Sequence, residues 1–198
     1  MTPAAARLLA LVRAEPVDTA AIAGLLDHLS PGDRREAIEA LGGPGLQGRL
    51  YAAVAGVPPV RLADLVPADA EPLREVIYHG KNSLPAFTLF QKRFCRPPAG
   101  TGGGLWGYNH QQLAWLTGPG YFVVHDEPGR GAAIDYREVP PRGCPGWPEV
   151  KANDRGFSRL VYKDMVDYLR RVAANVFIGC ATRRGRAIGS YFVLSRAA

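Results

Sequence analysis

Residues 175–195, NVFIGCATRRGRAIGSYFVLS, contain two runs of β-branched and aromatic residues with a short loop between them. The runs are Asn175–Thr182 and Ile188–Ser195, and the loop is Arg183-Arg184-Gly185-Arg186. Glycine adopts the positive φ that a tight reversal of the chain needs, so this pattern predicts an antiparallel hairpin. The hairpin anchors the prediction of antiparallel β structure in the second part of the chain.

From about residue 73 onward the sequence consists of short runs rich in Val, Ile, Tyr, Phe and Thr, separated by Gly and Pro clusters. This spacing is typical of antiparallel β proteins. In the run Phe87–Arg96, Phe90 and Lys92 share one face while Leu89 and Arg93 share the other, so both faces are chemically mixed. Such a strand suits a barrel wall with a partly filled interior. The other predicted strands are Arg74–His79, Tyr121–His125, Ala132–Val139 and Phe157–Tyr162, and Lys163–Val172 is predicted as a turn followed by a short helix.

The first 56 residues instead repeat apolar residues at helical spacing. Asp18 and Ser30 precede two of these segments as expected N-cap residues, and Gly56 ends the last one. We therefore predict an α+β protein with a small helical unit over residues 1–56, a linker over residues 57–64 and an antiparallel β-barrel over residues 65–198.

Composition and charge argue against a disordered, fibrous or membrane-spanning protein. The 198 residues are 47% hydrophobic and 21% charged, as is ordinary for a folded globular protein. Residues 1–60 carry five Lys/Arg against six Asp/Glu, and residues 61–198 carry nineteen against twelve, so the basicity belongs to the second part. The sequence shows neither an apolar run long enough to span a membrane nor a signal peptide.

The cysteines Cys95, Cys144 and Cys180 are odd in number and widely spaced, which fits neither a disulfide framework nor a metal-binding pair. We expect free thiols in a reducing compartment, and hence a cytoplasmic protein. The histidines lack the H-x-x-x-H spacing of a zinc site, and we predict neither a metal nor a cofactor.

Two motifs favour loops over binding sites. Gly102–Gly107 matches G-x-G-x-x-G, but it follows a Pro- and Gly-containing segment rather than a strand, which argues against dinucleotide binding. The Arg183–Arg186 loop is basic, yet the aromatic residues beside it alternate as strand-core residues do. This favours a solvated hairpin tip over a nucleic-acid site.

Polar residues that interrupt apolar segments are candidates for a ligand pocket, because such pockets are mostly apolar with a few convergent polar groups. The alternation in Ala132–Val139 places Tyr136 with Ile134 on the bulkier face, so Tyr136 is expected to point into the barrel. Hydrogen-bond networks in a core show the same pattern, and a structural role is the alternative for each residue. The predicted ligand-binding residues are Trp106, Tyr108, Trp115, Phe122 and Tyr136. The candidates for acid–base chemistry are His79, His110, Tyr162 and Asp164.

The stretch Leu160–Val172, with the later segments Phe177–Gly179 and Gly189–Arg196, resembles the C-terminal half of the GXWXG-motif family of lipocalin-like barrels. In that family a strand with an apolar-Tyr-Asp pattern is followed by Asp-x-Phe/Leu-Arg-x-Val, a glycine-containing strand and a closing aromatic strand. The resemblance covers about forty of the 198 residues, and Gly104–Gly107 is one residue shorter than G-x-W-x-G. It implies a small lipocalin-like barrel that holds a hydrophobic molecule.

These observations support three hypotheses. The first is binding of a small lipophilic molecule, of the fatty acid, isoprenoid or polyketide type, inside the barrel. The second is a proton-transfer, isomerase or cyclase enzyme with His79 or His110 as base and Tyr162 or Asp164 as partner, which requires a histidine inside the pocket. The third is an adaptor that meets another protein through residues 1–56. Whether the protein is an enzyme stays open.

Overall fold

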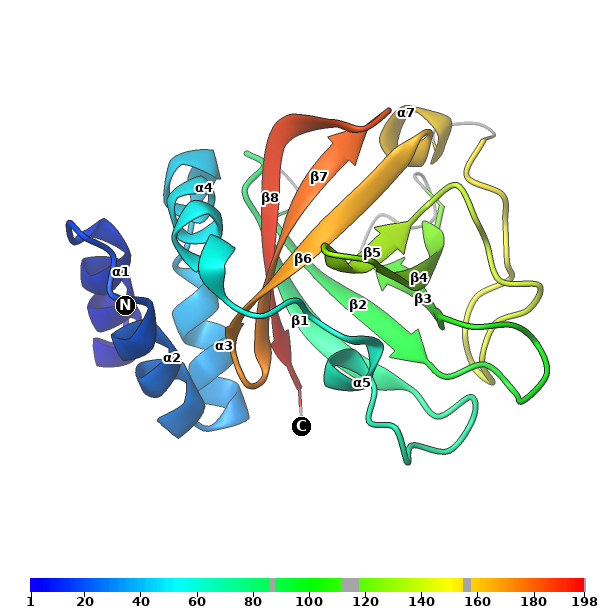
Figure 1. Ribbon diagram of the computed structural model, residues 1–198, viewed down its shortest axis with the longest axis horizontal. Helices are drawn as coiled ribbons and strands as arrows, with labels where there is room; N and C mark the ends of the chain where they lie inside the picture. The colour runs from blue at the N-terminus through cyan, green and yellow to red at the C-terminus, as the bar shows by residue number, and fades with distance from the viewer. Residues whose placement is uncertain (86–87, 112–117, 155–157, 198) are drawn as a thin grey trace.

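Helices precede strands along the chain in a computed structural model that describes residues 1–85, 88–111, 118–154 and 158–197 (Figure 1). Asp18 and Ser30 cap their helices as predicted, since their side chains accept hydrogen bonds from the backbone N–H groups of Ala21 and Asp33. The N-terminal helices are α1 (Pro3–Arg13), α2 (Thr19–His28), α3 (Pro31–Glu39) and α4 (Gly43–Ala53), followed by the 3₁₀-helix η1 (Val54–Gly56).

The strands form a closed antiparallel barrel in which each strand pairs with the next along the chain and β8 pairs with β1. This is the predicted α+β architecture, with a helical part followed by a lipocalin-like barrel. Because the barrel is closed, each of its strands has a neighbour on both sides, and no edge of the sheet is left exposed. The strands are β1 (Val76–Asn82), β2 (Leu89–Cys95), β3 (Leu105–His110), β4 (Tyr121–Glu127), β5 (Gly131–Asp135), β6 (Met165–Ala173), β7 (Val176–Arg183) and β8 (Arg186–Arg196).

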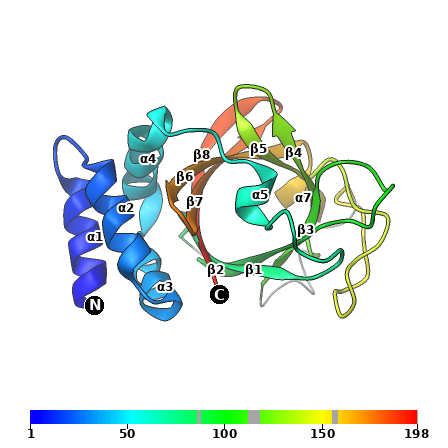
Figure 2. The same cartoon turned by 60° about the horizontal axis from the view of Figure 1, so that its bottom comes forward.

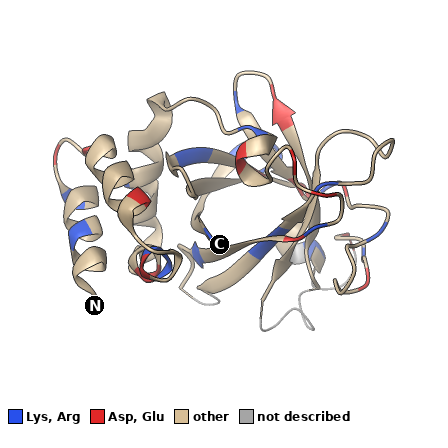
Figure 3. Ribbon diagram, turned by 90° about the horizontal axis from the view of Figure 1, so that it is seen from below, with Lys and Arg blue, Asp and Glu red and all other residues tan. Residues whose placement is uncertain are grey.

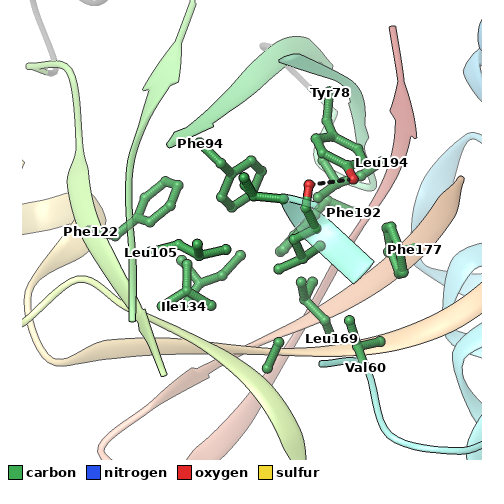
Figure 4. Close-up of a cluster of buried hydrophobic side chains, with 14 of the residues drawn as sticks. Val60, Tyr78, Phe94, Leu105, Phe122, Ile134, Leu169, Phe177, Phe192 and Leu194 are labelled. Carbon is green, nitrogen blue, oxygen red and sulfur yellow. Dashed lines mark hydrogen bonds between the residues drawn. The ribbon is translucent and has the colours of Figure 1, made fainter. Parts of the chain in front are cut away.

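The short helix α5 (Leu62–Leu65) closes one end of the barrel (Figure 2). Val60, just before α5, and Leu65, within it, are fully buried in the barrel core. Tyr78 on β1 donates its hydroxyl hydrogen to the Leu65 carbonyl oxygen at 2.9 Å, which ties α5 to the strands (Figure 4). The cavity that the barrel encloses lies at its opposite end.

The N-terminal helices pack against the outside of the barrel. Their apolar faces form one buried cluster with Val172, Val176, Ile178 and Val193 of β6, β7 and β8. Arg34 on α3 reinforces this contact, because its Nε donates to Ser195 Oγ at 3.1 Å and its Nη2 donates to the Arg196 carbonyl oxygen at 3.1 Å. In the view of Figure 3, acidic and basic residues are interspersed over both the helices and the barrel.

Three strand glycines make room for aromatic rings inside the barrel. In each case the glycine lies directly opposite a phenylalanine on the neighbouring strand, and a Cβ built on the glycine would come within 2.4 Å of the phenyl ring. A glycine under a cross-strand ring lets the ring lie flat over the backbone and fill the core of a small barrel. The pairs are Gly80–Phe90, Gly107–Phe122 and Gly179–Phe192.

Two predicted elements differ in the structure. Residues 158–162 of the predicted strand 157–162 form the helix α7 (Ser158–Tyr162), and the predicted helix within residues 163–172 belongs to the long strand β6. The apolar residues whose spacing suggested a helix, Leu169 and Val172 among them, lie on two opposite faces of a strand. Leu169 points into the barrel core and Val172 lies under the N-terminal helices, so burial on both faces erased the alternation.

The prediction of three free thiols is wrong. Cys95 and Cys144 form a disulfide, and only Cys180 is free among the described cysteines. The bond joins β2 to the long segment between β5 and α7, which the spacing of the cysteines gave no reason to expect. It also removes the basis on which we expected a reducing compartment. Among the described residues, no helix is both long enough and apolar enough to cross a membrane.

Candidate ligand cavity and its buried lysine–aspartate pair

A cavity of about 340 Å³ lies at the end of the barrel opposite α5, and Val161 and Tyr162 of α7 line it. Its mouth is mainly apolar, since the exposed side chains of Leu84, Val161 and Ile188 lie there, beside the guanidinium of Arg183. Known ligand pockets span about 300–1,000 Å³, so this cavity suits a small compound. Its deeper lining combines aromatic and apolar side chains with a few polar ones, namely Phe90, Lys92, Asn109, Tyr136, Tyr162, Met165, Asp167, Ala181 and Phe192.

Lys92 lies at the inner end of this cavity, with only 2% of its side chain exposed. Its ammonium group donates to Asn109 Oδ1 at 2.9 Å and to the Tyr136 hydroxyl, and it lies 3.8 Å from Asp167 Oδ2. The ring centroids of Phe192, Phe122 and Tyr136 lie 4.8, 4.9 and 5.0 Å from Nζ. The aromatic faces and the carboxylate together compensate for part of the cost of burying the charge.

The strand register brings these groups together from three strands and from the residue that follows a fourth. Lys92 on β2 lies directly opposite Asn109 on β3, and Asp167 on β6 lies opposite Ile134 on β5. Tyr136 follows β5 and stays in the sheet through a hydrogen bond from its N–H to the Met165 carbonyl oxygen. Each side chain falls on the inward phase of its strand, so the closed barrel aims all of them into one volume.

Burial shifts the pKa values of the charged pair in opposite directions. It lowers the pKa of the Lys92 ammonium from 10.5 to about 8 and raises the pKa of the Asp167 carboxyl from 3.8 to about 6, because both charged forms lose water. The attraction between the two charges opposes both shifts. Near neutral pH the cavity therefore holds an ion pair with no net charge.

Of the predicted site residues, Tyr136, Phe122 and Tyr162 lie inside the barrel. Tyr136 and Tyr162 line the cavity and stack on each other with centroids 5.0 Å apart. The Tyr162 hydroxyl accepts a hydrogen bond from Gln111 Nε2 at 3.3 Å. Phe122 packs beneath Lys92 rather than at the cavity surface. The expectation that Tyr136 points inward is thus confirmed.

Two other predicted ligand residues lie on the outer face of the barrel. Trp106 packs around the Cys95–Cys144 disulfide, and the Tyr108 ring lies 4.8 Å from that of Trp147. Both are out of phase with Asn109, which points inward from the same strand. Their burial comes from the segment between β5 and α7, which covers this side of the barrel. Trp115 lies outside the described residues.

The acid–base candidates are not assembled into one site. His79 points outward from β1, His110 is exposed at the end of β3, and neither lines the cavity. Partial burial lowers the pKa of both histidines. Asp164 lies in the turn before β6, where it forms an ion pair with Arg184 of the exposed hairpin tip at 3.0 Å. Only Tyr162 of the four candidates contributes to the cavity.

The sequence analysis did not consider Lys92 as a site residue. Asn109 and Asp167 belong to the polar residues that interrupt apolar segments, but neither was among the residues predicted to bind the ligand. Lys92 did carry a signal, because it shares its strand face with Phe90 and Phe94, and a charge on an apolar face needs a buried partner. The partner was hidden because Asp167 lies in the segment that was predicted to be helical.

The cavity is suited to holding and orienting a bound molecule. It offers apolar walls, a polar cluster at the inner end and a mouth that is mainly apolar but includes Arg183. Within the part of the chain that the structure describes, no cluster of three His, Cys, Asp or Glu side chains could hold a metal ion. Comparison with protein-family models, with curated proteins and with solved structures finds no match to this chain.

Proposed function

We propose that the protein binds a small hydrophobic molecule inside its barrel, with the polar end of the molecule held by the cluster around Lys92. The observation that carries this proposal is the combination of an apolar cavity of about 340 Å³ with a buried, charged and hydrogen-bonded group at its inner end. Buried ion pairs rarely add stability over apolar residues of the same size, so their presence favours a role in recognition.

The volume limits the ligand. It lies near the lower end of the range for ligand pockets, so the cavity encloses a short chain or a small ring system, and a longer chain would extend through the mouth. The resemblance to the GXWXG-motif family of lipocalin-like barrels supports the same proposal, since it implies a barrel that holds a hydrophobic molecule.

Binding of a neutral fluorescent probe, N-phenyl-1-naphthylamine, tests the proposal. We expect saturable fluorescence enhancement by the wild-type protein. Ala181 lines the cavity, so Ala181→Leu should fill part of it and weaken probe binding at least about fivefold. Ala187→Leu, at an exposed position of β8, is the matched control and should bind as wild type does. Equal binding by both variants, or no saturable binding by the wild type, would contradict the proposal.

Native mass spectrometry before and after organic extraction gives an independent test, because a lipophile carried through purification would appear as added mass. The enzyme hypothesis with a histidine base gains no support, since neither His79 nor His110 lines the cavity. The adaptor hypothesis gains none either. The apolar faces of the helices are buried against one another and against the barrel.

A further inference from the structure

We propose that the polar end of the ligand is a neutral hydrogen-bond donor, a hydroxyl or an N–H group, which binds Asp167 Oδ1. This inference rests on the proposed function and names the chemistry of the ligand's head group. It departs from the fatty acids expected from the sequence, whose carboxylates accept hydrogen bonds and donate none.

Two of the three N–H donors of Lys92 are already used in hydrogen bonds inside the protein. An ammonium group has three N–H donors. In the structure the three acceptors around it are Asn109 Oδ1, the Tyr136 hydroxyl and Asp167 Oδ2, of which the carboxylate oxygen lies farthest away, at 3.8 Å. The third donor faces Asp167, so a ligand carboxylate that reached it would lie beside the Asp167 carboxylate, whose negative charge would repel it.

Asp167 has the complementary property. Its Oδ1 is buried, and among the described residues no group donates a hydrogen bond to it. The side chain is 4% exposed and lines the cavity. Buried carboxylate oxygens in folded proteins are almost always hydrogen-bonded, and an unsatisfied one is costly. A donor on a molecule within the cavity would satisfy this oxygen.

The charges at the inner end of the cavity also favour a neutral head group over a carboxylate. At the inner end of the cavity the Lys92–Asp167 pair has no net charge near neutral pH, so a ligand carboxylate there would add an uncompensated negative charge to a poorly hydrated volume. A neutral donor adds none. The cation Arg183 also lines the cavity, but it lies at the exposed mouth, where it donates to the Val161 carbonyl oxygen. A donor would also stabilise the ionised form of Asp167, whose pKa burial raises, so binding of the donor should weaken as the pH falls below about 6.

Three naphthalenes of nearly equal size separate the possible head groups: 2-naphthol donates a hydrogen bond, 2-methoxynaphthalene does not, and 2-naphthoate carries a negative charge. Their dissociation constants at neutral pH are measured by calorimetry on the full-length protein. We expect 2-naphthol to bind roughly tenfold more tightly than 2-methoxynaphthalene, because only the naphthol can donate a hydrogen bond to the charged Asp167. The difference between 2-naphthol and 2-naphthoate should be larger still.

Substitutions of Asp167 and of Asp164 test which residue causes the preference for 2-naphthol. Asp167→Asn should reduce the preference for 2-naphthol over the ether, whereas Asp164→Asn should preserve it, since Asp164 lies outside the cavity and pairs with Arg184. If Asp167→Asn does not fold, the double variant Lys92→Met with Asp167→Leu removes both charges together. This variant should bind the naphthol and the ether with equal affinity.

The outcomes distinguish this inference from the proposed function. Tighter binding of the naphthoate, or a preference for naphthol that persists in the double variant, would overturn the choice of a donor head group and leave the binding cavity intact. Failure of all three compounds to bind, together with failure of N-phenyl-1-naphthylamine, would overturn both.

Discussion

The Tyr136 hydroxyl is a shared point in the buried network, because it accepts hydrogen bonds from both Lys92 Nζ and Asn109 Nδ2. Tyr136→Phe would leave two buried donors without this acceptor. These contacts predict a loss of about 1–3 kcal/mol in the free energy of unfolding.

Urea denaturation of Tyr136→Phe and of the control Tyr168→Phe measures this loss. The Tyr168 hydroxyl lies 3.5 Å from Glu127 in a partly exposed position, so its removal should change stability by less than about 0.5 kcal/mol. Equal effects in the two variants would show that the Tyr136 hydroxyl is not structurally coupled to Lys92.

The Lys92–Asp167 pair should make stability depend on pH in an unusual direction. Between pH 3.8 and about 6 the native Asp167 holds a proton that the unfolded chain has lost, so stability falls as the pH rises. Between about 8 and 10.5 the unfolded chain holds a proton that native Lys92 has lost, so stability rises with pH. The contribution of the pair is therefore least favourable between these two windows.

The double variant Lys92→Met with Asp167→Leu isolates this contribution, because all other titrating groups are common to both proteins. We expect the stability of the wild type relative to the variant to be lowest near pH 6–8 and to recover on either side. Chemical denaturation across the pH range measures it. A difference that stays constant with pH would contradict the assigned pKa shifts.

At the level of elements, the glycines beneath aromatic rings predict a contrast between two Gly→Ala substitutions. On β7 a Cβ at Gly179 would lie 2.1 Å from the Phe192 ring, so Gly179→Ala should destabilise the protein by about 1–3 kcal/mol through overpacking. On α2 a Cβ at Gly24 meets nothing within 4 Å, so Gly24→Ala should stabilise it by about 0.5–1 kcal/mol. Thermal or urea unfolding gives both values, and effects of the same sign would contradict the packing.

The docking of α3 on the barrel predicts a second contrast. Arg34→Ala removes the hydrogen bonds to Ser195 and to the Arg196 carbonyl, at a cost of about 1–3 kcal/mol. Arg35→Ala removes an exposed ion pair with Glu39 and should cost less than about 0.5 kcal/mol. If urea unfolding shows equal costs, the contact between α3 and β8 contributes nothing specific.

For the whole molecule, the shared apolar cluster predicts that the barrel depends on the helices. Deletion of residues 1–56 would expose the apolar outer faces of Val172, Val176, Ile178 and Val193 to water. We expect the remaining chain to unfold at a lower temperature or to aggregate. Circular dichroism and size-exclusion chromatography of residues 57–198 provide the test, and a monomer with the melting temperature of the full chain would show that the helices are dispensable.

Local chemistry accounts for what could be predicted from the sequence. The N-caps Asp18 and Ser30 act within one turn, and the C-terminal hairpin is set by its loop and flanking strands. Alternation likewise placed Tyr136 inside the barrel and put Lys92 on the same face as Phe90. These features depend on residues close to one another in the chain, so their short-range patterns survive in the sequence.

The features that the sequence did not predict depend on the closure of the barrel and on the segments that cover its outer face. The helices bury the outer face of β6, and the segment after β5 buries Trp106 and Tyr108, so apolar residues occur on both faces and alternation no longer identifies the interior. The pairing of Lys92 with Asp167, like the Cys95–Cys144 disulfide, joins segments far apart in the chain. Such contacts depend on which strands meet across a closed barrel, and that is a property of the assembled sheet rather than of any local pattern.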